Sequence, residues 1–331
     1  MGRLEGLREL KEASKRSETS SISSDLRGGS AFILVLWVLF FLSIMSIAVR
    51  AYAFSAIRLA DYLKRRCVCY YLARAGVKRA MLKVKEDETP TYDSLQDSWA
   101  KEEIKEIPLG EGRFTVEAIV DEERKININK VPRFVLENLL EKAGVGKMEA
   151  MDISACILDW RDKDSQPYEG GAEDDYYQGL EFPYPCKDAD FEVVYELLLV
   201  RGMEKDIFEK IKDRITVYGN GAININTADA QTLEILGINS SLIDKIMDFR
   251  TQGNVFKSKG SIITDLKAVE GISPEEKDIL HNLIQQGLLG VISSVFSTEC
   301  RGEIGEGKRK SKRSIKIVFT RTGEMLFWQE R

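Results

Sequence analysis

The chain has 331 residues, of which 44% are hydrophobic and 31% charged, and its formal net charge is −5. This composition is typical of folded proteins and excludes a chain that is disordered throughout. The mild acidity excludes a general nucleic-acid binder, and a single histidine with five scattered cysteines excludes histidine-rich zinc sites and disulfide scaffolds.

The chain begins with a polar stretch and continues into an uncharged one. Residues 1–30 are serine-rich and carry six basic and five acidic side chains, so we expect a poorly ordered extension. Residues 31–49 (AFILVLWVLFFLSIMSIAV) hold no charge. As a helix they would span about 28 Å, close to the thickness of the hydrocarbon layer of a bilayer. We predict a single membrane-spanning helix, whose orientation the flanking charges leave open.

The helical pattern continues beyond the apolar stretch. Apolar residues recur at three- and four-residue steps from Tyr52 to Val84, so we expect one helix from about Ala31 to Lys85. Its second half is amphipathic and should pack on a soluble domain. Strands are predicted over residues 113–121, 292–299, 315–320 and 324–329. Because residues 124–289 have mostly helical patterns, the predicted fold class is α+β, with a helical insertion in a small antiparallel sheet.

The predicted insertion contains an internal repeat. ININKVPRFVLENLL begins at Ile126 and ININTADAQTLEIL begins at Ile223. The second copy resembles helix-hairpin-helix modules, as found in bacterial competence DNA receptors. However, its hairpins at Gly237 and Gly271 lack a second glycine, and residues 222–290 hold nine acidic and six basic side chains, which would repel a polyanion. We interpret the repeat as a packing unit and keep a membrane-anchored DNA-binding or uptake receptor as the alternative function.

An acidic segment lies within the first half of the insertion. Residues 152–192 carry twelve Asp or Glu against three Lys or Arg. Carboxylates this crowded must be exposed or neutralised by a cation, and oxygen ligands without histidine suit Ca²⁺. Asp162, Asp164 and Glu173 match part of an EF-hand loop, but Pro167 stands where that loop needs glycine. The open alternatives are a calcium site built from loops and a solvated acidic loop.

Other chemistry finds little support in the sequence. No nucleophile motif or phosphate-binding loop accompanies the carboxylates, so we expect a protein that is not an enzyme. Cys156 and Cys186 flank the acidic segment and could form a disulfide in an oxidising compartment or remain free.

Read in order, the motifs resemble one family. Gly29-Ser30 precede the apolar helix, and YYLARAGVKRA, YDSLQDSWA, DEERKININ, ILDWRDKDS, GAEDDYY, LLLVRGM and TVYGNGAININTA follow. This order resembles the minor pseudopilin K of type II secretion systems (general secretion pathway protein K) over roughly residues 28–330. The resemblance implies a type IV pilin-like fold with a large inserted helical domain containing helix-hairpin-helix or SAM-like repeats. The implied parts are a leader (1–29), the N-terminal helix (30–90), the sheet (91–123 and 290–331) and the inserted domain (124–289).

The same resemblance implies processing, location and partners. Prepilin peptidase would cleave between Gly29 and Ser30 on the cytoplasmic face, Ser30 would be N-methylated, and the chain would span the inner membrane once with its C-terminal domain in the periplasm. The implied partners are minor pseudopilins I and J and the major pseudopilin, at a pseudopilus tip that the subunit caps or initiates, with no nucleic acid. Pilin-type subunits usually carry Glu at the fifth mature position. This chain has Leu34 there, and members of the K family also lack that Glu. The implied Ca²⁺ ligands are Asp159, Asp162, Asp164, Glu173 and Asp174.

Overall fold

The computed structural model describes residues 5–307 and 310–331, with the side chains of residue 12 and of residues from 31 onward. Two compact units are present, residues 1–65 and residues 66–331. Helix α1 (Glu5–Lys85) makes up the described part of the first unit and continues into the second. The stretch expected to be a poorly ordered extension is helical from Glu5 onward. The first turns are rich in Leu, Glu, Lys and Arg, which favour helix.

The apolar stretch forms part of α1, as expected. From Ala31 the helix is long and apolar enough to cross a membrane. Every side chain from Ala31 to Val49 is exposed within the first unit. An apolar surface of this extent requires lipid or other apolar helices around it.

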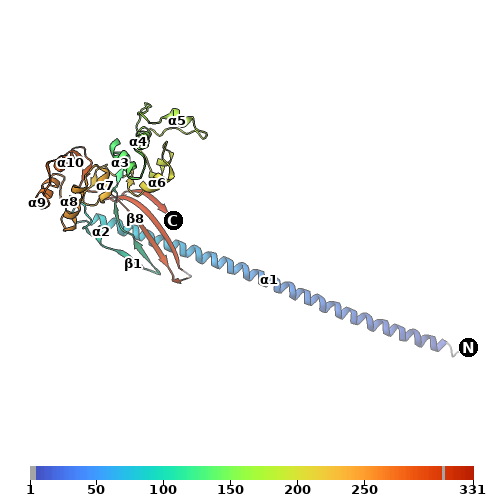
Figure 1. Ribbon diagram of the computed structural model, residues 1–331. Helices are drawn as coiled ribbons and strands as arrows, with labels where there is room; N and C mark the ends of the chain where they lie inside the picture. Colours follow the sequence, from blue (N-terminus) through green and yellow to red (C-terminus); the bar gives the residue numbers. More distant parts are fainter. Residues whose placement is uncertain (1–4, 308–309) are drawn as a thin grey trace. The chain divides into compact units, whose positions relative to one another are not determined.

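Within the second unit, an antiparallel sheet packs against the C-terminal part of α1 (Figure 1). The strand order is β1-β2-β8-β9-β10, and β3 also pairs with β8. The strands are β1 (Ile104–Leu109), β2 (Gly112–Val116), β3 (Val120–Asp121), β8 (Val295–Ile304), β9 (Ser311–Thr320) and β10 (Met325–Glu330).

The three C-terminal strands are confirmed, with boundaries that differ by up to five residues. The strand expected over residues 113–121 is instead two short strands, β2 and β3. Strand β1 was not predicted, because Pro108 and the three-residue spacing of Ile104 and Ile107 break the alternation that marks a strand. The structure has an irregular register there, with a positive φ of 52° at Glu106.

Close contact between α1 and the sheet depends on glycine. A Cβ atom at Gly302 would lie 2.0 Å from the carbonyl oxygen of Cys69 and 2.6 Å from the nitrogen of Ala73. Gly112 and Gly76 lie against the same interface. Glycines therefore let the helix backbone approach the strands directly, and the aromatic and aliphatic side chains around them form the core of this helix-and-sheet layer.

The chain between β3 and β8 forms the inserted domain. Its helices are η1 (Glu122–Arg124), α3 (Arg133–Lys142), α4 (Lys147–Arg161), α5 (Asp174–Gln178), η2 (Val194–Leu199), α6 (Lys205–Ile211), α7 (Ala230–Ile235), α8 (Ser240–Thr251), α9 (Ile262–Val269) and α10 (Pro274–Gln285), while α2 (Ser98–Lys101) precedes the sheet. Local signals set several helix starts: Asn239 caps α8, and Ser273 and Glu276 form a capping box before α10.

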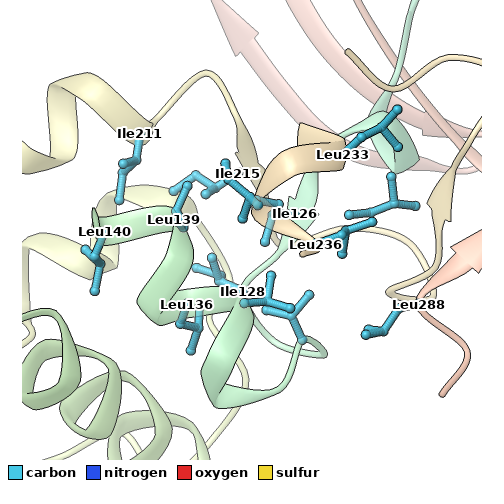
Figure 2. Close-up of a cluster of buried hydrophobic side chains, with 14 of the residues drawn as sticks. Ile126, Ile128, Leu136, Leu139, Leu140, Ile211, Ile215, Leu233, Leu236 and Leu288 are labelled. Atoms are coloured by element: carbon cyan, nitrogen blue, oxygen red, sulfur yellow. The ribbon is translucent and has the colours of Figure 1, made fainter. Parts of the chain in front are cut away.

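The predicted repeat is visible in the backbone. β4 (Ile126–Asn127) pairs in parallel with β5 (Ile215–Thr216), and β6 (Ile223–Asn224) pairs in parallel with β7 (Leu289–Gly290). Each ININ sequence thus supplies the first strand of a short parallel pair, and the second strand of that pair lies at the end of the same repeat. Figure 2 shows Leu136 and Leu139 of the first repeat and Leu233 and Leu236 of the second in one hydrophobic cluster. The two repeats therefore share a core.

Candidate metal centre in the acidic segment

In each repeat, one asparagine side chain binds both backbone groups of a phenylalanine further along the chain, and we call this arrangement the asparagine clamp. Its position shows where the acidic segment is inserted. In the second repeat, the Asn226 side chain bonds both the N–H and the C=O of Phe256 at 2.9 Å. In the first repeat, Asn129 makes the same two bonds to Phe191, at 2.8 and 2.9 Å. In the second repeat, residues 252–255 connect α8 to the clamped Phe256. In the first repeat, residues 162–190 connect α4 to the clamped Phe191. The acidic segment is therefore an elaborated loop, and Figure 1 shows it with α5 beyond the end of α4.

Asp159 orders this loop from its base. It lies fully buried in the last turns of α4 and accepts backbone hydrogen bonds from Tyr168 (3.0 Å) and Ala172 (2.6 Å). Gly171 is required there, because a Cβ atom at that position would lie 1.9 Å from Oδ2 of Asp159. The chain thus packs closely around the Asp159 carboxylate. Burial raises the pKa of Asp159, and the two hydrogen bonds lower it by less.

Asp174 has a similar anchoring position. Its Oδ1 accepts a 2.7 Å hydrogen bond from the backbone N–H of Cys186, which ties α5 to the returning chain. Asp159 and Asp174 thus bind backbone donors on either side of the remaining acidic residues.

Three other expected ligands come together between these anchors. One carboxylate oxygen from each of Asp162, Asp164 and Glu173 lies within 4.8 Å of the other two. Oδ1 of Asp162 and Oε1 of Glu173 are buried, and neither has a hydrogen-bond partner in the part of the chain that the structure describes. Asp164 is exposed at the rim, where its Oδ1 accepts from the N–H of Gln166. Buried oxygens of this kind need a proton or a cation.

Sequence reasoning missed a fourth carboxylate. Asp188 groups with Glu173 and Cys186 within the same 4.8 Å limit, and its Oδ1 is also buried without a hydrogen-bond partner among the described residues. Its φ of 50° is unusual for a residue other than glycine. Its distance from Asp162 along the chain breaks any local spacing rule, so the signal available in the sequence was only its place in the acidic segment.

The electrostatics of this carboxylate cluster, Asp162, Asp164, Glu173 and Asp188, are unfavourable without a cation. Burial, followed by the like charges of Asp159, Asp162 and Asp188, raises the pKa of Glu173 to about 7. Burial and then the charge of Asp164 raise the pKa of Asp162. A bound divalent cation would remove both causes, because it neutralises the charges and gives the buried oxygens a partner.

The neighbouring basic side chains supply that neutralisation only in part, since the charge of Arg161 lowers the pKa of Asp162 by less than burial and the charge of Asp164 raise it. The guanidinium of Arg161 donates to the carbonyl oxygens of Ile128 and Val131, and Lys187 forms an ion pair with Glu196 at 2.6 Å. The donor set is therefore oxygen-rich and anionic, which fits Ca²⁺.

The two cysteines of the segment are free thiols. Cys156 donates to the carbonyl oxygen of Gly170 and Cys186 to that of Asp159. Burial raises the pKa of Cys186 to about 12, so this thiol stays protonated and is a poor ligand at neutral pH. Of the two alternatives left open by the sequence, the structure has the free form.

A second acidic group, Asp87, Asp93 and Asp97, lies near the sheet. Arg321 pairs with Asp87 and Asp93, and the N–H and hydroxyl of Ser94 donate to Asp97. These carboxylates already have partners, so the group serves as an internal polar network and does not have the features of the carboxylate cluster.

Comparisons with known proteins extend these observations. Residues 112–220 match the sequence family described as type II secretion system protein K, and residues 219–283 match the helix-hairpin-helix motif. A type II secretion system protein K of Klebsiella pneumoniae is 24% identical over 61% of this chain and 66% of its own length. One of Pectobacterium carotovorum is 33% identical over 38% and 41%, and one of Aeromonas hydrophila is 24% identical over 75% and 78%. The alignments with the first two thus span less than two thirds of those relatives.

A solved structure has the same fold. One chain of the crystal structure of the GspK-GspI-GspJ complex from enterotoxigenic Escherichia coli matches with a TM-score of 0.63 at 18% identity, covering 83% of this chain and 99% of that chain. The helix-hairpin-helix expectation for the second repeat is confirmed, and the relatives do not favour the DNA-receptor alternative. With its inserted helical repeats, antiparallel sheet and long N-terminal helix, the chain is similar to type II secretion system protein K, and the model of that family matches residues 112–220.

Proposed function

We propose that this chain is a minor pseudopilin that caps or initiates the pseudopilus tip of a type II secretion system. The observation that carries this proposal is the insertion of a large helical domain between β3 and β8 of a pilin-like sheet. A filament of pilin-like subunits grows by packing apolar helices side by side. A subunit with a bulky domain on its sheet suits a filament end, because the domain would hinder a further subunit from joining there.

The apolar part of α1 has two environments in this proposal. In the inner membrane it holds the subunit in lipid, and in the filament the same exposed side chains pack on neighbouring helices. Leu34 fits a terminal position, because a carboxylate there would need a partner from a subunit beyond it and would be costly in apolar surroundings if unpaired.

The neighbouring structure suggests the partners. It is a complex of GspK with GspI and GspJ, so we infer that this chain assembles with the corresponding minor pseudopilins I and J and, through them, with the major pseudopilin. We further propose cleavage between Gly29 and Ser30 by prepilin peptidase, N-methylation of Ser30 and a periplasmic position for residues 66–331. The structure describes only the backbone at Gly29 and Ser30, and residues 1–4 of the proposed leader lie outside the described residues.

We also propose a structural Ca²⁺ ion in the acidic segment. Asp162, Asp164, Glu173 and Asp188 would hold it, with Asp159 and Asp174 positioning the loop around it. When bound, the ion neutralises the crowded carboxylates, so the segment can keep its carboxylates buried at neutral pH. This assignment rests on the buried oxygens that lack a hydrogen-bond partner within the described residues.

Co-purification tests the function. The tagged full chain is co-expressed with the minor pseudopilins I and J and the prepilin peptidase of its own secretion system, solubilised in detergent and captured. An unrelated tagged single-span protein is the control. We expect I and J to co-elute with this chain and mass spectrometry to place Ser30 at the mature N-terminus. Elution of the chain alone, together with a salt-sensitive shift of duplex DNA, would instead support the receptor alternative.

A further inference from the structure

A cavity of about 360 Å³ lies between the inserted domain and the sheet. Glu299 of β8 and Lys316 of β9 line it on the sheet side, and Arg124, Arg214 and Asp229 line it on the side of the inserted domain. Lys316 alternates along β9 with Ile315 and Ile317, whose side chains pack in the core beneath α1. The cavity therefore opens on the face of the sheet opposite α1.

Two cations of this cavity, Arg124 and Lys316, make no direct bond to a carboxylate among the described residues. The Asp229 carboxylate accepts from Arg214 at 3.2 Å and from the N–H of Thr232 at 2.7 Å. Lys125 is paired with Glu122. Arg124 and Lys316 have no hydrogen-bond or ion-pair partner anywhere in residues 5–307 and 310–331, and the Arg124 side chain is partly buried. Cationic side chains that line a cavity without a bonded carboxylate favour an anionic oxygen beside them.

A further arginine, Arg250, lies near Arg124 and lines a different cavity. Arg250 lies close enough to Arg124 that burial, followed by the charge of Arg124, lowers its pKa to about 10. Arg250 donates to the carbonyl oxygen of Ala228 and has no carboxylate partner in the described part of the chain. Among the residues that the structure describes, Asp229 is thus the one carboxylate directly bound to a member of this group of arginines, Arg214.

An adjoining cavity of about 320 Å³ is of a different character. It shares Lys125, Asp213, Lys316 and Arg331 with the first cavity, and its remaining lining includes Tyr195, Tyr218, Val318 and Phe327. Tyr195 is 60% exposed, so part of this apolar lining faces solvent. We call the two cavities together the sheet groove, which has a cationic end at Arg124 and an apolar end at Phe327.

We propose that the sheet groove binds an acidic peptide segment of a partner protein. A carboxylate of the segment would be held by Arg124 and Lys316, and an apolar side chain next to it would enter between Tyr195 and Phe327. Charge complementarity supports this occupant, because the groove offers unpaired cations beside an apolar surface. A nucleic acid fits less well, since it carries a charge at every nucleotide and Asp213 and Glu299 on the walls would repel that run, whereas the peptide needs only one carboxylate at the two cations. The proposal does not depend on the secretion role.

Fluorescence anisotropy with the full chain in detergent tests the groove. The probe is a short labelled peptide in which Glu residues flank a Phe, and its matched control has Gln in place of Glu. We expect the acidic peptide to bind at least about tenfold more tightly than the amide peptide, because a charge-assisted contact is worth roughly 1.5 kcal/mol or more. Added salt should weaken the acidic peptide alone.

Variants locate the binding. Arg124→Gln and Lys316→Gln should each weaken the acidic peptide about tenfold, and Phe327→Ala should weaken both peptides. Lys277→Gln, on the exposed face of α10 and outside the groove, should leave both affinities unchanged. Equal binding of the acidic and amide peptides would overturn the proposal even if a variant failed to fold. So would full displacement of the peptide by inorganic phosphate or duplex DNA at the peptide's own concentration.

Discussion

Glu173 provides a measurable link between the carboxylate cluster and stability. Its pKa is raised from 4.5 to about 7 by burial and by neighbouring carboxylates. In the metal-free chain, the folded state therefore holds a proton between these pH values that the unfolded state has already released. Unfolding then becomes easier as the pH rises through this window, because the free energy of unfolding falls wherever the native state binds more protons.

The size of this effect follows from the shift. One pKa unit corresponds to about 1.4 kcal/mol, so the full shift would be about 3 kcal/mol, which partial contact with water reduces to about 1–2 kcal/mol. Ca²⁺ removes this loss, since it binds ionised carboxylates and stabilises the folded state by about 2.7 kcal/mol at a concentration one hundred times its Kd. The metal-free chain should thus lose stability between pH 4.5 and 7, while the Ca²⁺-loaded chain, whose carboxylates are ionised in both the folded and the unfolded state, should keep it.

Urea unfolding of the full chain in detergent, followed by tryptophan fluorescence, measures both effects. Trp160 is a suitable reporter because it lies in the last turn of α4 and packs on Tyr177. Glu173→Gln should make the metal-free chain about 1–2 kcal/mol more stable at pH 7.5 and should remove most of the gain from Ca²⁺. Glu169→Gln, an exposed change in the same segment, should alter neither. The reasoning is refuted if Glu173→Gln leaves the metal-free pH profile and the Ca²⁺ response unchanged.

Three further predictions concern the helix, the sheet and the repeat. Gly302→Ala should lower the free energy of unfolding by about 1–3 kcal/mol in urea, because its Cβ atom would meet the backbone of α1. Gly260→Ala, with open space around it, should change the stability by no more than about 0.5 kcal/mol, and equal effects of the two substitutions would refute the close contact. Asn226→Ala should cost about 2–4 kcal/mol in the same assay, since it leaves both backbone groups of Phe256 unpaired, and a cost below that of an exposed substitution would contradict the clamp. Leu34→Glu should impair tip placement, and unchanged secretion and assembly with I and J would count against it.

Local patterns were enough to predict the elements whose signals lie in neighbouring residues. The uncharged run of residues 31–49, the amphipathic continuation of α1 and the strands β8 to β10 follow from periodicity alone. The repeated ININ sequences identified the two halves of the inserted domain. Their function as openings of parallel strand pairs was not predicted, because the partners Ile215 and Leu289 lie far along the chain.

For the candidate metal centre, the sequence predicted the acidic segment. It did not show which carboxylates bind backbone N–H groups and which remain available to a cation. Asp159 and Asp174 have the same chemistry as Asp162 and Glu173, yet only the backbone path shows that the first two bind N–H groups while the others keep buried oxygens without a partner within the described residues. Asp188 joins the cluster because the chain returns there after α5.

The sequence by itself therefore determined the long apolar helix, the α+β class, the repeat and the acidic segment, because each depends on composition or on spacing between near neighbours. Only the tertiary structure decided which carboxylates meet, how closely α1 approaches Gly302 and where the sheet groove lies. These features join residues that are far apart in the chain. Their distances depend on how helices and strands pack, and local propensity carries no information about that packing.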